Sequence, residues 1–178
     1  MKVTPYLKVL AEKEGSDVYL TAGALPSAKF NGVLTPLGKE VCPAGYVVKE
    51  TYEDTLFGVN GHSMRDTSSP NTNFALLTRV SLTHPLENTT EYGRRIAQLT
   101  NTLGGKTPIL QRLGDLRGCR RSTWERIHRS YVEPTFKEVT PGDISMAYPS
   151  RMVKNILEGL EMLDRVMPGV NSDSTLIY

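Results

Sequence analysis

The chain has 178 residues, 39% of them hydrophobic and 22% charged, which is enough for one or two small domains with a hydrophobic core. Its 21 lysines and arginines nearly balance 19 aspartates and glutamates, so the charge gives no indication of a nucleic-acid or anionic-membrane partner. It shows no membrane-spanning apolar run and no signal-peptide pattern, and its two cysteines are too few for a disulfide framework or a zinc site. We therefore expect a cytoplasmic protein of bacterial type that holds no metal.

Residues 1–40 predict a small unit of one helix and several strands. A helix is expected from Thr4 to Gly15, because Thr4 can cap it and apolar residues recur along one face. Residues 17–22 predict a strand, and residues 28–34 predict a hairpin around an Asn-Gly turn. Prolines and glycines over residues 36–45 then predict a domain boundary near residues 38–45.

Residues 41–178 mix strands and helices without the regular alternation of a parallel α/β sheet. The helices are predicted from apolar residues spaced three to four apart, and the strands from short apolar or β-branched runs. In chain order the predicted elements are a strand at 46–48, a polar loop at 58–73, a buried strand at 74–82, helices at 91–103, 122–128 and 149–167, and a strand at 176–178. The fold class expected from this mixture is α+β, with a helix-plus-strands unit followed by a larger mixed domain.

Positive charge is concentrated between residues 108 and 137, which hold seven basic and three acidic side chains, whereas residues 138–178 hold three basic and six acidic ones. The densest part is the stretch from Gln111 to Arg129, with six arginines and the single tryptophan, Trp124. Because guanidinium groups bind phosphates and carboxylates through paired hydrogen bonds, this stretch is a candidate site for an anionic substrate or cofactor.

The same arginines also have a purely structural interpretation. They would pair with the acidic residues of the segment, and Trp124 would fill an edge of the core; these acids are Asp115, Glu125 and Glu133. Binding to nucleic acid is a third alternative, which the near-neutral charge of the whole chain disfavours.

Other motifs are compatible with nucleotide binding or nucleophilic catalysis but identify neither. Residues 104–107 (GGKT) resemble the end of a phosphate-binding loop, but Thr100 stands where that loop needs a glycine, so a helix end is expected. No G-x-G-x-x-G turn for a dinucleotide is present. A nucleophilic His–Cys pair is an alternative, either His62 with Cys42 or His128 with Cys119, although isolated residues of these types are usually structural.

From about residue 45 to its end, the chain resembles the C-terminal, substrate-side domain of bacterial FAD-dependent dehydrogenases. The matching stretches are residues 73–77 (NFALL), 91–93 (EYG), 111–116 (QRLGDL), 120–124 (RRSTW), 132–134 (VEP), 140–143 (TPGD) and 168–170 (PGV). The stretch Cys42-Pro-Ala-Gly45 is similar to the Cys-Pro-Gly-Gly turn of that family, which lies near the flavin, with Ala44 in place of a glycine.

This resemblance implies FAD as the cofactor, with Cys42 and Gly45 on the cofactor side. It also implies a substrate site, for which we expect His62 and Arg65 from the polar loop, and Arg112, Arg117, Arg120 and Arg121 as anion-binding groups. Because the dinucleotide turn is missing, the FAD-binding domain or subunit would be supplied elsewhere, and the chain alone is not expected to bind FAD tightly or to turn over substrate.

Residues 4–40 are similar instead to the start of type IV pilus retraction ATPases, through residues 5–13 (PYLKVLAEK), 15–23 (GSDVYLTAG) and 26–32 (PSAKFNG). That resemblance implies an alternative function, an interaction module that assembles with pilus motor subunits. Together the two resemblances predict a rearranged, truncated or chimeric chain, with residues 1–40 as one segment and residues 41–178 as a partial substrate domain.

Overall fold

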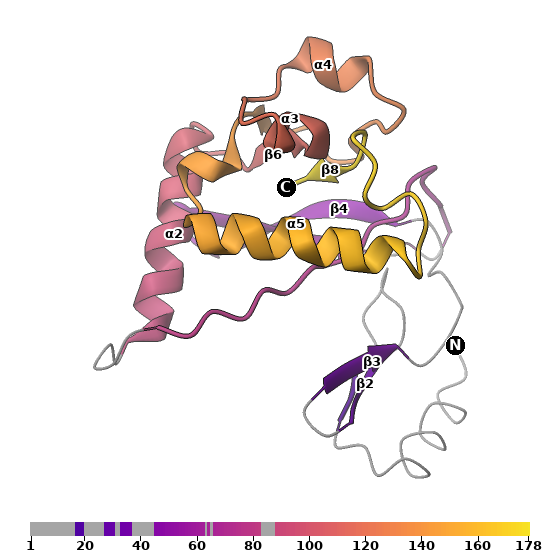
Figure 1. Cartoon of the computed structure of the whole chain (residues 1–178). Helices are drawn as coiled ribbons and strands as arrows, with labels where there is room; N and C mark the ends of the chain where they lie inside the picture. The colour runs from indigo at the N-terminus through magenta and orange to yellow at the C-terminus, as the bar shows by residue number, and fades with distance from the viewer. Residues whose placement is uncertain are drawn as a thin grey trace. The chain divides into compact units, whose positions relative to one another are not determined.

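The computed structural model of the chain describes residues 17–19, 27–30, 33–36, 45–62, 64, 66–82 and 88–178. These residues contain both helices and strands, so the predicted α+β class is confirmed (Figure 1). The chain divides into two compact units, which are Met1–Val47 with Gly61–Ala75 (unit 1) and Val48–Asn60 with Leu76–Tyr178 (unit 2). The helix predicted from Thr4 to Gly15 lies outside the described residues.

Unit 1 contains an antiparallel sheet of three short strands in the order β1-β2-β3. The strands are β1 (Asp17–Tyr19), β2 (Ser27–Phe30) and β3 (Val33–Pro36). The register pairs Phe30 with Val33, which leaves two residues for the connection. The predicted hairpin is therefore confirmed, because an Asn-Gly pair suits a two-residue turn between strands of this twist.

A second hairpin follows, formed by β4 (Tyr46–Glu53) and β5 (Leu56–His62). The prediction of a loop over residues 58–73 is therefore wrong for residues 58–62, which belong to β5. The polar residues that suggested a loop are satisfied across the hairpin instead, as Asn60 Nδ2 donates to Glu50 Oε1 at 2.9 Å. Lys49 Nζ also lies 3.7 Å from the centre of the Phe57 ring, a favourable cation–π distance.

In unit 2, helix α2 (Thr89–Leu103) is joined to β5 through the buried side chain of Asn101. Its Oδ1 accepts from the Phe57 amide at 2.8 Å, and its Nδ2 donates to the Phe57 carbonyl at 3.0 Å. Asn101 thus satisfies a strand residue much as a neighbouring strand would. The helix ends at Gly104, and Gly105 follows with a φ of 65°, so the expected helix end within GGKT is confirmed.

The centre of unit 2 is the strand β6 (Ile109–Arg112), which pairs in parallel with β7 (Thr140–Pro141) and antiparallel with β8 (Leu176–Ile177). The predicted C-terminal strand is thus confirmed, whereas β6 and β7 were not predicted. Around this sheet lie the short helices α3 (Leu113–Arg117) and α4 (Trp124–His128) and the 3-10 helix η1 (Ile144–Met146). The hydrophobic core is built on Leu110, Ile127 and Val139, with Phe136, Leu176 and Tyr178 packed against them.

The strand predicted over residues 74–82 is wrong, because none of these residues belongs to a helix or strand. Their side chains nevertheless alternate between partly buried and exposed, as in an extended chain. Figure 1 shows the segment as a long irregular connection leading to α2. The apolar, β-compatible run is consistent with an extended backbone, but strand formation also needs a neighbouring strand, and none of the described strands pairs with this segment.

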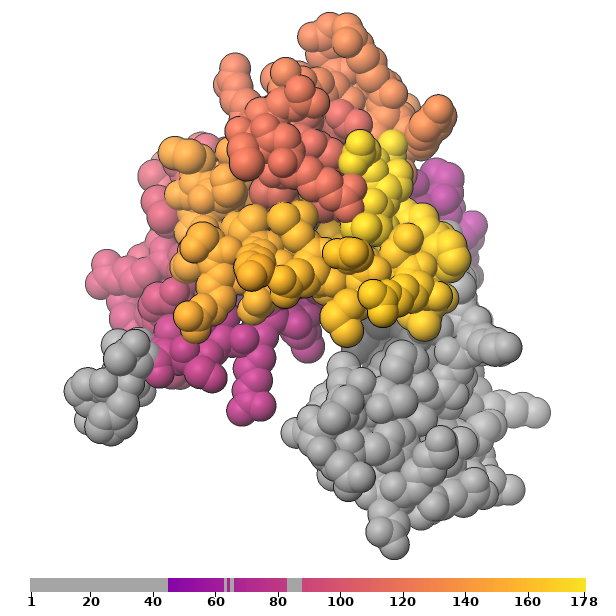
Figure 2. Space-filling view, viewed as in Figure 1, coloured from indigo at the N-terminus to yellow at the C-terminus, as the bar shows by residue number. Residues whose placement is uncertain are grey.

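Helix α5 (Ser150–Asp164) confirms the predicted helix after Pro149, although it ends earlier than residue 167. It ends there because Asp164 Oδ1 accepts from the backbone amides of Gly169 at 2.7 Å and Asn171 at 3.1 Å, which stabilises the following turn. Figure 2 shows α5 lying uncovered across one face of unit 2. Of the helices in the described ranges, none has the length and apolar character needed to cross a membrane.

Candidate functional site

The fully buried side chain of Gln111 connects three separate segments of unit 2. Its Nε2 donates to the Arg120 carbonyl at 2.9 Å and to Asp143 Oδ1 at 3.3 Å, and its Oε1 accepts from the Ile144 amide at 2.9 Å. A side-chain amide can donate and accept at the same time, so it suits this bridging position. Gln111 therefore fixes the turn that carries Arg120 and the start of η1 against β6.

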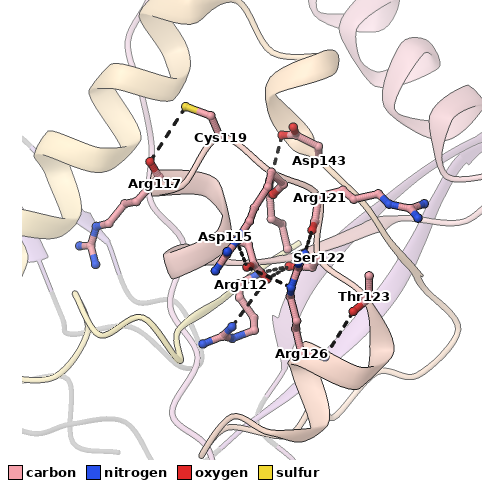
Figure 3. Close-up of polar contacts among 11 residues, drawn as sticks. Arg112, Asp115, Arg117, Cys119, Arg121, Ser122, Thr123, Arg126 and Asp143 are labelled. Carbon is pink, nitrogen blue, oxygen red and sulfur yellow. Dashed lines mark hydrogen bonds and ion pairs between the residues drawn. The ribbon is translucent and has the colours of Figure 1, made fainter.

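The carboxylate of Asp115, on α3, is also fully buried and accepts hydrogen bonds from side chains of neighbouring segments. Its Oδ1 accepts from Arg120 Nε at 2.8 Å, and its Oδ2 accepts from Ser122 Oγ at 2.8 Å. Ser122 Oγ itself accepts from the Arg112 amide at 2.8 Å, so its hydroxyl hydrogen is directed to Asp115. Figure 3 shows Arg112, Ser122 and Arg126 converging on Asp115. We call the five residues Arg112, Asp115, Arg120, Ser122 and Arg126 the Asp115 cluster.

The three guanidinium groups of the Asp115 cluster approach the carboxylate to different distances. Arg120 Nε is hydrogen-bonded at 2.8 Å, whereas Arg112 Nη1 lies 3.7 Å from Oδ2 and Arg126 Nε lies 4.0 Å from Oδ1. The two longer distances are those of ion pairs without a hydrogen bond. The Arg112 side chain is only 18% exposed, compared with 56% for Arg120 and 37% for Arg126. Arg112 and Arg126 thus keep N–H groups that Asp115 does not use.

The turn between α3 and Ser122 explains how Arg120 reaches Asp115. Cys119 has a φ of 50°, in the left-handed region that non-glycine residues rarely adopt, and the Arg120 amide donates to the Asp115 carbonyl at 3.0 Å. The chain reverses at this point, so the side chain of Arg120 points back to the helix it has just left. Cys119 is a free, exposed thiol.

Two of the four arginines predicted to bind an anion lie outside the Asp115 cluster. Arg117 Nη1 donates to Asp173 Oδ1 at 2.8 Å and its Nη2 donates to the Asn171 carbonyl at 3.0 Å, so it holds the C-terminal loop. The Arg121 side chain points away from Asp115 (Figure 3). The structure thus brings together Arg112 and Arg120 but not Arg117 and Arg121.

Arg126 belongs to the cluster but was not predicted. Its Nη1 donates to the Arg121 carbonyl at 2.8 Å, and its amide donates to Thr123 Oγ1 at 3.3 Å. The signal in the sequence was Thr123, an N-cap residue type that fixes where α4 begins and therefore which way Arg126 points.

The structural interpretation of the arginine-rich stretch is confirmed for two of its acids. Asp115 pairs with arginines as described above, and Glu125 forms an ion pair with Arg129 one helical turn away. Trp124 does not fill the core, since it is 37% exposed and its ring stacks on His128 with the centroids 5.6 Å apart. Ile127, which is fully buried, is the residue of α4 that enters the core.

The predicted cofactor-side residues Cys42 and Gly45 and the predicted substrate-side residues His62 and Arg65 all fall in unit 1, where the structure describes Gly45 and His62 but not Cys42 or Arg65. Gly45 is buried, and a Cβ at this position would lie 2.8 Å from Asn73 Nδ2 and 2.8 Å from the His62 carbonyl oxygen. A side chain at position 45 would therefore displace its neighbours. Ser69 Oγ donates to the Gly45 carbonyl at 2.6 Å, which fixes the turn from the other side.

Asn73 is a residue of this region that the sequence reasoning did not select. Both its Oδ1 and its Nδ2 are buried and have no hydrogen-bond partner among the described residues. Leaving a buried amide unpaired costs about 1–3 kcal/mol, so most buried amides in folded proteins have a hydrogen-bond partner. The Asn73 amide is therefore a candidate to pair with a bound ligand. The amide offers one acceptor and two donors, a pattern complementary to the carbonyl and N–H groups along the edge of a flavin ring. The residues present around Gly45 therefore fit a flavin.

Of the two His–Cys pairs considered above, the structure gives His128 a stacking partner in Trp124, and the pair of His62 with Cys42 falls partly outside the described residues. Within the described ranges, no three His, Cys, Asp or Glu side chains are grouped so that they could hold a metal ion.

Comparison with known proteins gives one family. The family model for "FAD-dependent protein, C-terminal domain-like" matches residues 40–178. Neither a curated protein nor a solved structure matches the chain. The match supports the resemblance described for residues 45–178, while the resemblance of residues 4–40 to pilus retraction ATPases stays a prediction.

Proposed function

Since the chain belongs to the FAD-dependent protein, C-terminal domain-like family, we propose that it supplies the substrate-side part of a FAD-dependent oxidoreductase. The observation that best supports this role, beyond the family itself, is the unpaired, buried Asn73 amide beside Gly45. The sequence has no dinucleotide-binding turn, so in this proposal the FAD-binding domain lies outside these 178 residues, which do not turn over substrate by themselves.

In this role the residues around Gly45 would bind and orient the cofactor. Because Gly45 has no side chain, Asn73 and the His62 carbonyl lie close against its backbone, and the unpaired Asn73 amide would hydrogen-bond the flavin. By the resemblance, Cys42 would belong with Gly45 to the cofactor side, and His62 and Arg65 to the substrate side. A bound flavin supplies the redox chemistry, whereas the protein supplies position, hydrogen bonds and the exclusion of water.

Reconstitution tests the proposal. The chain is co-expressed with the FAD-binding domain of a FAD-dependent protein of this family from which the C-terminal domain has been removed. We expect a complex with stoichiometric flavin absorbance. Gly45→Ala should strongly reduce the flavin content, because its Cβ would push Asn73 aside.

Gly93→Ala is the matched control, since a Cβ on Gly93 in α2 meets no atom within 4 Å. It should leave flavin content unchanged. Failure of the wild-type chain to assemble with the FAD-binding domain, or full flavin content in Gly45→Ala, would refute the proposed role.

The alternative function concerns residues 4–40, which would form an interaction module for type IV pilus motor subunits. The family model does not reach below residue 40, so this role stays a prediction. Co-purification of the chain with hexameric retraction ATPase subunits, and its loss on deletion of residues 1–40, would test it.

A further inference from the structure

The Asp115 cluster carries more positive than negative charge. Three guanidinium groups face one carboxylate, and each makes its ion pair with Asp115. Asp143 joins the same network through Gln111, but its Oδ1 accepts from Gln111 and from Ser145, and in the described part of the chain it forms no ion pair with an arginine. The cluster therefore keeps an excess of two positive charges around a fully buried carboxylate, with Arg120 and Arg126 partly exposed to solvent.

Arg112 and Arg126 also have hydrogen-bonding capacity left. Arg112 Nε is buried and has no hydrogen-bond partner among the described residues. The whole Arg112 side chain is 18% exposed. Arg126 uses Nη1 for the Arg121 carbonyl and stands 4.0 Å from Asp115 through Nε. A guanidinium group has five N–H donors in a planar fork, so each of these arginines can still donate to an oxyanion.

We propose that the Asp115 cluster is a phosphate site, in which Arg112 and Arg126 donate to the phosphate oxygens and Asp115 holds the arginines in position. A phosphate group carries about 1.5 to 2 negative charges at neutral pH, which matches the excess of two positive charges, whereas one carboxylate would neutralise only half of it. Asp115 holds the Arg120 side chain by a hydrogen bond and the Arg112 side chain by an ion pair, and Ser122 fixes the Arg112 backbone amide, so little order is lost on binding.

Phosphate is thus the group that these arginines would recognise in the substrate-side part. This assignment adds to the proposed function but does not depend on it. The phosphate can belong to free inorganic phosphate or to a phosphate ester. Inorganic phosphate, glycerol 3-phosphate and formate therefore serve as the three probes, and no flavin is present in the assay. If phosphate does not bind, the result of the reconstitution experiment is unaffected. If reconstitution fails, the result of the phosphate titration is likewise unaffected.

The measurement is a titration of the full chain at low salt, followed by isothermal calorimetry and by the fluorescence of Trp124, the single tryptophan, which lies two residues before Arg126 on α4. We expect saturable binding of both phosphates and much weaker binding of formate. Arg126→Gln should weaken phosphate binding about tenfold or more, as expected when hydrogen bonds to a charged group are lost. Arg112→Lys should also weaken it, although the charge is kept, because lysine lacks the planar fork.

Arg129→Gln is the matched control. It removes the same charge from a residue just after α4, but Arg129 pairs with Glu125 and lies outside the Asp115 cluster. It should change the affinity by less than about twofold, as expected for screened surface charge. Far-UV circular dichroism tests whether each variant is folded. If Arg126→Gln does not fold, Arg112→Lys still tests the phosphate site.

Three results would overturn the proposal. They are the absence of saturable phosphate binding, equal weakening by Arg126→Gln and Arg129→Gln, and binding of formate as tight as that of phosphate. If inorganic phosphate binds as tightly as glycerol 3-phosphate, the group alone is recognised; tighter binding of the ester would indicate a phosphorylated substrate or cofactor. Both of these last results support a phosphate site.

Discussion

Replacing Asp115 by asparagine removes the buried charge that three arginines share. The asparagine amide has one acceptor oxygen, whereas Arg120 Nε and Ser122 Oγ both donate to the carboxylate in the wild type. One of these donors would then face an NH₂ group, and the three guanidinium groups would repel one another without compensation. Breaking a buried ion pair costs about 3–5 kcal/mol. Because Arg120 and Arg126 are 56% and 37% exposed and can turn to solvent, we expect a loss of about 3 kcal/mol.

Urea unfolding, followed by the fluorescence of Trp124, measures this loss within unit 2. With a slope of about 2 kcal/mol per molar urea, a loss of about 3 kcal/mol lowers the midpoint by about 1.5 M. Asp173→Asn is the control, since Asp173 also pairs with an arginine, Arg117, but its side chain is 69% exposed. That pair should contribute no more than about 0.5 kcal/mol. If the two variants have the same midpoint, the Asp115 cluster does not stabilise unit 2 as described.

Two further predictions concern the turn after α3 and the buried tyrosines. Cys119→Gly should raise the free energy of unfolding by about 0.5–1 kcal/mol in urea, because glycine adopts a φ of 50° without strain, whereas Cys119→Ala should change it little; equal effects would exclude backbone strain. Burial raises the pKa of Tyr148 and Tyr178 above the ordinary value of 10.0. Each tyrosine therefore stabilises the fold fully below about pH 10, and this contribution is lost as pH rises through the higher folded pKa. A double variant with Phe at both positions should lose less stability in alkaline urea titrations than the wild type; an unchanged pH dependence would contradict the assignment.

The sequence by itself determined the elements whose signals are local. The Asn-Gly turn fixed the β2–β3 hairpin, Gly104 and Gly105 fixed the end of α2, and the apolar spacing after Pro149 fixed α5. Each of these depends on interactions between residues a few positions apart, which a sequence displays directly. The family was also readable from ordered motifs between residues 73 and 170.

Only the tertiary structure decided which arginines act together. Six arginines within 19 residues have no single helical spacing, so the sequence could not separate Arg112, Arg120 and Arg126 from Arg117 and Arg121. Their positions depend on the reversal at Cys119, on Gln111 and on the distant Asp173. The same limit explains the extended segment over residues 74–82, whose apolar, β-compatible sequence indicates a backbone shape but not a pairing strand. Pairing and burial are properties of residues far apart in the chain, and they exist only once the chain has folded.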